Sequence, residues 1–81
     1  MKKEKLIIYG VGGHAKSVSD SVDNNLYDVV FFIDNFKTGS FMNKPILKDD
    51  FIYKKEANNY SYFIAIGDNK KRSEIFKKII N

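Results

Sequence analysis

The chain has 81 residues, a net charge of +4, one histidine and no cysteine. The lack of cysteine excludes disulfides and thiolate metal ligation, and a lone histidine leaves no donor set for a structural zinc site. No segment approaches the roughly 18 consecutive apolar residues of a membrane helix, and no signal peptide is recognisable, so we expect a cytoplasmic protein without a membrane partner.

The positive charge comes from short clusters of lysine, such as residues 70–72. A basic patch can bind nucleic acid, but here the clusters alternate with aspartate and glutamate, and no nucleic-acid-binding motif accompanies them. We therefore interpret the lysines as solvated helix surfaces and expect no nucleic-acid partner.

The first regular element is an apolar run that leads directly into a glycine cluster. Its lack of polar alternation predicts a parallel strand, Lys5–Tyr9, that is buried on both faces. The glycines allow a sharp turn and close approach to a ligand. A helix is predicted from His14 to about Asn24, because Ala15, Val18 and Val22 follow a helical spacing.

The rest of the chain continues the alternation of strands and helices. We predict a second buried strand at 29–33, a short edge strand at 44–47, a short helix at 51–56, a third buried strand at 62–66, and a final helix that Asp68 or Asn69 caps and that ends near Ile80. The apolar stripe of the final helix is predicted to consist of Ile75, Phe76, Ile79 and Ile80.

These elements predict a single α/β domain over residues 1–81, a small doubly wound parallel sheet of about four strands with helices on both faces. Ligands of such sheets bind beyond the carboxyl ends of the strands, where the strand order reverses. If the first strand lies between the second and the third buried strand, three loops converge there. They are Gly10–His14, Asp34-Asn35 and Gly67–Asn69.

Three kinds of function fit this cleft. Gly10-x-Gly12-x-x-Ala15 matches a dinucleotide fingerprint, and Asp34 lies where an acidic residue binds a ribose hydroxyl, which favours an NAD(P)-binding half-domain of an oxidoreductase. A nucleoside diphosphate sugar fits the size of the chain better, because a dinucleotide needs two such halves. In the third reading the glycines only form turns, and the chain is an interaction module without a ligand.

The residues that could do chemistry are few. His14 could contact a phosphate or a sugar, or it could simply cap the turn. Neither a Ser-His-Asp arrangement nor a pair of carboxylates poised for catalysis is recognisable, and Asp34 and Asp68 are accounted for as turn residues. The residues alone therefore predict neither a catalytic group nor a metal site.

Four segments together carry a resemblance to a known family. Residues 5–18, with their Gly-Val-Gly-Gly-His loop, resemble the opening of the PglD/NeuD-type sugar O-/N-acyltransferases. Phe32–Asn35 and Lys44–Leu47 resemble the next two signatures of that family, although Asn35 replaces the second aspartate of the common pair. Residues 63–72, which read Phe-Ile-Ala-Ile-Gly-Asp-Asn-x-x-Arg, closely resemble its last motif.

The resemblance implies a Rossmann-like N-terminal domain that binds a UDP-linked amino sugar. It further implies a C-terminal left-handed β-helix that binds acetyl-CoA, carries the catalytic histidine and forms trimers. The hexapeptide repeats of that second domain do not occur in these 81 residues, so we expect an excised or truncated domain that is non-catalytic in isolation, needs no cofactor of its own, and is a monomer or a weak dimer.

The resemblance also implies which residues approach the substrate. The glycines and His14 would lie near the nucleotide-sugar, Asp34 and Asn35 near the uridine, and Gly67 would allow close backbone approach, whereas Arg72 could reach a phosphate or brace its own helix. The full set of predicted substrate-binding residues is Gly10, Gly12, Gly13, His14, Asp34, Asn35, Gly67, Asp68, Asn69 and Arg72.

Overall fold

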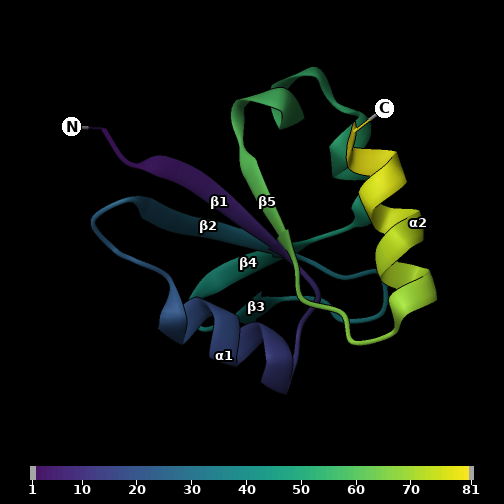
Figure 1. The fold of residues 1–81 in the computed structure, drawn as a ribbon, viewed down its shortest axis with the longest axis horizontal. Helices are drawn as coiled ribbons and strands as arrows, with labels where there is room; N and C mark the ends of the chain where they lie inside the picture. The colour runs from purple at the N-terminus through teal and green to yellow at the C-terminus, as the bar shows by residue number, and fades with distance from the viewer. Residues whose placement is uncertain (1, 81) are drawn as a thin grey trace.

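The apolar runs of the sequence form one sheet in the computed structural model, which describes residues 2–80. Its strands are β1 (Glu4–Tyr9), β2 (Tyr27–Ile33), β3 (Ser40–Phe41), β4 (Lys44–Leu47) and β5 (Ser61–Ile64). The strand order is β3-β4-β2-β1-β5, and every neighbouring pair is parallel except β3 and β4 (Figure 1). The first strand therefore lies between the second and the last, which is the condition under which the loops were expected to converge.

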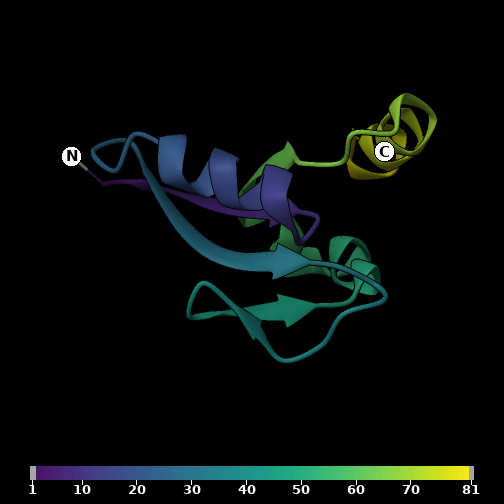
Figure 2. The same ribbon diagram turned by 90° about the horizontal axis from the view of Figure 1, so that it is seen from below.

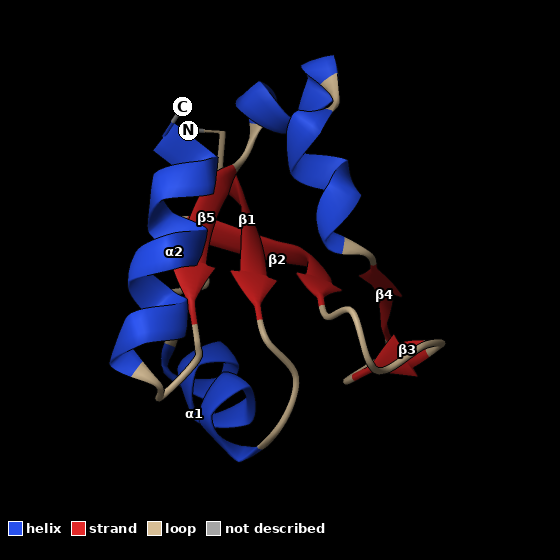
Figure 3. Cartoon of the chain, turned by 90° about the vertical axis from the view of Figure 1, so that its right-hand side faces the viewer, coloured by secondary structure: helices blue, strands red, loops and turns tan. Residues whose placement is uncertain are grey.

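Four helical segments accompany the sheet. They are the α-helices α1 (Gly13–Ser21) and α2 (Asn69–Ile80), and the 3₁₀ segments η1 (Asp49–Tyr53) and η2 (Lys55–Asn59). The chain leaves β1 toward α1 and leaves β5 toward α2, and Figure 3 shows α2 running alongside β5. Because β1 and β5 are neighbours, the sheet reverses its winding direction between them.

Alternating side chains of β1 supply both halves of the core. Ile7 and Tyr9 pack in a cluster that contains Ile75 of α2 and also residues of η1 and η2. Leu6 and Ile8 pack on the opposite face in a cluster that contains Ala15 of α1. Successive strand residues point to opposite faces, so helical segments cover both faces, as predicted, and the continuous apolar run is explained.

The edge of the sheet beyond β2 contains a hairpin that the sequence did not reveal. Strands β3 and β4 pair Ser40 with Pro45 and Phe41 with Lys44, which leaves Met42 and Asn43 as a two-residue turn. Figure 2 shows this hairpin along the lower edge of the molecule. Both turn residues have positive φ, 51° and 65°, which is the backbone of a type I′ turn.

Several predicted boundaries shift. The single helix expected at 51–56 is wrong: Lys54 is extended, with ψ 150°, and separates η1 from η2. Strand β5 ends at Ile64 rather than at 66, and α1 ends at Ser21 rather than near Asn24. Helix α1 stops early because Val22 adopts an extended backbone, with ψ 135°, before the turn into β2.

The predicted apolar stripe of α2 is only half correct. Ile75 is buried and Ile79 packs against the same core cluster, but Phe76 and Ile80 are 55% and 62% exposed. Residues four positions apart share one face of a helix, whereas the next residue along lies about 100° round the axis. The described helix therefore contacts the sheet along one narrow line.

Candidate functional site

The first of the three predicted loops begins at Gly10, which lies between the ends of β2 and β5. Its N–H donates to Ile33 O at 2.7 Å, and its φ of 119° favours glycine. A Cβ at this position would lie 2.8 Å from the backbone oxygen of Ala65. Gly10 is thus needed for the close packing of three strand ends, whether or not a ligand binds.

The glycine loop continues into the amino end of α1. Gly12 is the N-cap residue, with φ 150°, and no side chain caps the helix. The first N–H groups of a helix have no partner within it, and the helix dipole makes this end favourable for an anion. A Cβ on Gly12 or Gly13 would meet no heavy atom within 4 Å, so the space in front of this helix end is open.

The second loop is built around Asp34. Its Oδ1 accepts hydrogen bonds from the backbone N–H groups of Phe36 at 2.7 Å and Lys37 at 3.0 Å, which fixes the turn that follows β2. Lys37 Nζ then donates to Val11 O at 3.4 Å and connects this turn with the glycine loop. Among the hydrogen bonds of the described chain, none uses Asp34 Oδ2, so this acceptor atom is not needed for the turn.

Asn35 has an internal structural role. Its Oδ1 accepts from the backbone N–H of Asp49 at 2.9 Å, and its carbonyl oxygen accepts from Lys48 Nζ at 2.9 Å. Hydrogen bonding by Asn35 is also the main reason that the pKa of Asp49 lies below its ordinary value of 3.8. The amide that replaces the second aspartate of the common pair therefore holds β2 and η1 together.

The third loop connects β5 to α2. Asp68 caps the helix, because its Oδ1 accepts from the backbone N–H groups of Lys70 at 2.9 Å and Lys71 at 3.2 Å. This confirms Asp68, rather than Asn69, as the capping residue. The Arg72 guanidinium donates to the side-chain oxygen of Asn69 and so braces its own helix. Gly67 has open space where a Cβ would lie.

A cleft of about 360 Å³ lies between the ends of β1 and β2 and helix α2. Its apolar floor includes Tyr9, Ile33 and Ile66, and three of the predicted residues line it, namely Gly10, Asp34 and Asn35. The strands reach this edge with their carboxyl ends, as the arrowheads of β1 and β5 in Figure 3 indicate. The three loops therefore lie at one edge of the sheet, but they do not converge on one cleft, because only Gly10, Asp34 and Asn35 of the predicted residues line it.

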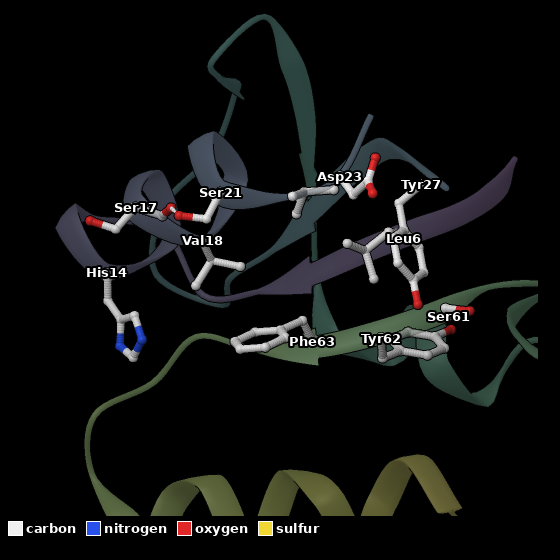
Figure 4. A pocket seen from close by; sticks show the side chains of 11 residues that line it. Leu6, His14, Ser17, Val18, Ser21, Asp23, Tyr27, Ser61, Tyr62 and Phe63 are labelled. Carbon is white, nitrogen blue, oxygen red and sulfur yellow. Dashed lines mark hydrogen bonds between the residues drawn. The ribbon is translucent and has the colours of Figure 1, made fainter. Parts of the chain in front are cut away.

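The other predicted residues lie around this cleft rather than in it. His14 is exposed and lines a separate apolar groove of about 490 Å³ between α1 and β5, with Tyr27 and Asp23 at its other end (Figure 4). Asn69 and Arg72 line a third hollow, between β5 and α2. Gly12, Gly13, Gly67 and Asp68 lie at the same edge of the sheet but line none of these three cavities.

The other nine lining residues of the cleft escaped the sequence analysis as site residues, namely Tyr9, Ile33, Phe36, Asp49, Ile66, Lys71, Glu74, Ile75 and Lys78. Tyr9 Oη donates to Asp49 Oδ2 at 3.1 Å, and Lys78 Nζ lies 3.6 Å from the same oxygen. Burial, and then the nearby Asp49 carboxylate, raise the pKa of Tyr9 well above its ordinary value. Phe36 directly follows the Asp34-Asn35 pair, and that adjacency is a signal that could have identified it.

The described residues contain no group of three or more His, Cys, Asp or Glu side chains arranged to hold a metal ion. Nor is any helix in residues 2–80 long and apolar enough to cross a membrane.

The central strand with its glycine loop and the reversal of winding beside it define this chain as a small Rossmann-like α/β domain. Residues 5–79 match the PglD N-terminal domain family, and the chain belongs to that family.

Two solved structures share the fold. The acetyltransferase domain of PglB from Neisseria gonorrhoeae FA1090 in complex with acetyl coenzyme A superposes with a TM-score of 0.81 at 23% identity, covering 98% of this chain. A second structure of the same domain gives a TM-score of 0.82 at 23% identity over 96% of this chain. In both comparisons this chain spans 40% of the solved chain.

Proposed function

We propose that this chain is the substrate-binding domain of a sugar acetyltransferase, and that it holds the nucleoside diphosphate part of a UDP-linked amino sugar. Membership of the PglD N-terminal domain family supports the acetyltransferase context. The proposed ligand class is supported by three features that lie at one edge of the sheet: an uncapped helix end, a carboxylate with one unused oxygen and an apolar cleft.

Each part of the ligand has a counterpart at this edge. The diphosphate would lie at the glycine loop, where the N–H groups of the first turn of α1 are uncapped. Asp34 Oδ2 would accept a hydrogen bond from a ribose hydroxyl, because only Oδ1 is needed for the turn. The base would then enter the cleft beside Asp34. In this arrangement the domain binds and orients the sugar and performs no bond-making step itself.

The acetyl donor belongs to a different part of the proposal. The Neisseria domain is in complex with acetyl coenzyme A, and this chain spans 40% of that domain. We propose that the donor is bound outside the region that the two chains share, and that residues 2–80 need no cofactor. Titration of this chain with acetyl coenzyme A is then expected to give no heat of binding, and measurable binding would contradict this part.

The ligand can be tested with a substitution that preserves the turn. Asp34→Asn keeps an oxygen at Oδ1 for the two backbone N–H groups and replaces the unused acceptor by a donor. Asp23→Asn is the matched control, because Asp23 Oδ1 accepts from the N–H of Asn25 at 2.9 Å in a similar turn, which precedes β2 instead of following it. Calorimetric titrations with UDP, UDP-N-acetylglucosamine and NAD would be run on all three proteins.

We expect UDP and UDP-N-acetylglucosamine to bind the wild type and the Asp23→Asn variant equally. Loss of a hydrogen bond to a charged acceptor should weaken both ligands in the Asp34→Asn variant by about tenfold or more. Binding of NAD without UDP would instead favour a half-domain of an oxidoreductase. No heat from any of the three ligands would overturn the proposal in favour of glycines that only form turns.

A further inference from the structure

The most exposed large apolar side chain of the described residues lies at the mouth of the cleft. Phe36 is 92% exposed, although it directly follows the last buried residues of β2 and the turn at Asp34-Asn35. Single exposed apolar residues are common on protein surfaces and need no explanation by themselves. Phe36 differs because it is also one of the residues that line the 360 Å³ cleft.

The backbone that carries this ring is held on both sides. The N–H of Phe36 donates to Asp34 Oδ1 at 2.7 Å. On the preceding side, the side-chain oxygen of Asn35 accepts from the backbone N–H of Asp49 in η1, and its carbonyl oxygen accepts from Lys48 Nζ, at 2.9 Å each. On the following side, Lys37 donates through its Nζ to Val11 O. An aromatic ring on a fixed backbone loses little conformational entropy when it binds a partner.

The surroundings of the ring suit a flat heteroaromatic group. The cleft floor is apolar, with Ile33 and Ile66. Its α2 wall is mixed in charge, because Lys71, Glu74 and Lys78 line it and Lys78 Nζ lies 3.6 Å from the Asp49 carboxylate. Asp34 provides the unused acceptor next to Phe36. A nucleobase offers a π-face to an exposed aromatic ring and carries its phosphates away from the apolar floor, so this mixture of surfaces matches a nucleotide better than a free sugar.

We propose that Phe36 is the stacking platform for the base of the bound nucleotide, and that it determines the preference of this domain for a nucleotide over a sugar phosphate. This inference rests on the proposed function, since it assigns one part of the same ligand to a residue. Phe36 is a binding residue in this proposal and has no part in holding the fold together.

The test compares Phe36→Ala, Phe36→Trp and a control, Leu26→Ala. Leu26 is 52% exposed in the turn before β2, away from the cleft, so its substitution removes a similar exposed side chain. Calorimetric dissociation constants would be measured for UDP and for ribose 5-phosphate, which lacks the base. Thermal unfolding of each variant would be recorded in the same buffer.

We expect Phe36→Ala to weaken UDP binding by roughly five- to 150-fold, which is the range for removal of a ring that stacks on a base. Phe36→Trp should retain binding, Leu26→Ala should not alter it, and the melting temperatures should stay close to that of the wild type. The affinity for ribose 5-phosphate should be the same in Phe36→Ala as in the wild type. Upfield shifts of the uracil H5 and H6 resonances of UDP should also vanish in Phe36→Ala.

The outcomes separate this inference from the proposed function. Equal UDP affinities in the wild type and in Phe36→Ala would overturn the stacking role and leave the proposed function intact. Equal weakening of UDP and ribose 5-phosphate would also overturn it, because the ring would then act on the whole ligand. A wild type that binds no UDP would overturn both.

Discussion

Tyr9 at the end of the central strand donates a hydrogen bond to Asp49 at the start of η1, over 3.1 Å and across 40 positions of the sequence. Lys78 of α2 lies 3.6 Å from the same carboxylate oxygen, and Asn35 binds the backbone of Asp49. One carboxylate therefore joins β1, the turn after β2 and α2. These are the elements that enclose the proposed ligand cleft.

This arrangement makes Tyr9→Phe informative. Removal of the hydroxyl loses one partly buried hydrogen bond and should lower the free energy of unfolding by about 1 kcal/mol. Tyr62→Phe is the control, because Tyr62 Oη donates to Ala57 O at 2.8 Å and its loss is of the same kind. Chemical denaturation of both variants would measure the loss in the free energy of unfolding that each substitution causes. No loss of stability in Tyr9→Phe would contradict the role given to this bond.

Asp49 should also make the stability of the fold depend on pH. Its pKa in the folded chain is lowered from 3.8, so the folded state favours the ionised form. This contribution is fully present above 3.8 and is lost as the pH falls through the folded value. We expect Asp49→Asn to abolish this part of the acid sensitivity, which denaturation curves between pH 2 and 6 would reveal.

The exposed neighbour Asp50 offers a control with the same change of charge. Asp50→Asn should leave the acid transition where it is in the wild type. If the two variants gave superimposable pH profiles, the hydrogen bonds to Asp49 would not be the cause of the acid sensitivity of the fold.

Two neighbouring glycines should respond in opposite ways to alanine. At Gly10 a Cβ would clash with the backbone of Ala65, and the φ of 119° is unfavourable, so Gly10→Ala should destabilise by at least about 1–3 kcal/mol. Gly13 begins α1 with open space around it, so Gly13→Ala should stabilise by about 0.5 kcal/mol. Melting curves would measure both, and equal effects would refute the geometry described for Gly10.

Gly67 separates binding from folding most cleanly among the glycines. Its backbone lies outside the left-handed region, and a Cβ would meet nothing within 4 Å. Gly67→Ala should therefore leave the unfolding free energy within about 0.5 kcal/mol of the wild type. If the ligand approaches this backbone closely, the same variant should bind UDP more weakly. Unchanged titration curves would remove Gly67 from the site.

The sequence predicted those elements whose signal is local. The uninterrupted apolar runs of β1 and β2 indicated strands buried on both faces, whereas the order of the three buried strands entered only as a condition that the structure meets. The hairpin β3–β4 remained hidden, because its turn uses Met42 and Asn43 at positive φ where Asn-Gly is the usual signature.

In the candidate site, too, only residues with a local signal in the sequence were predicted. Asp34 and the glycines were found because they directly follow buried strands. The position of Asp49 against Asn35 and Tyr9 depends on how η1 packs, and no spacing in the sequence encodes it. For Phe36 the only signal was its position directly after the Asp34-Asn35 pair, and its exposure of 92% could not be read from the sequence, because phenylalanine is usually buried.

The most direct test of the central claim is a map of ligand-induced shifts in the amide NMR spectrum during titration with UDP-N-acetylglucosamine. The account predicts that shifted amides cluster at three loops, residues 10–15, 34–37 and 66–69, and that the residues that line the rest of the groove between α1 and β5, namely 6, 17, 18, 21–23, 27 and 61–63, are unaffected. Shifts confined to that groove, or no shifts at saturating ligand, would contradict a nucleotide-sugar site at the carboxyl edge of the sheet.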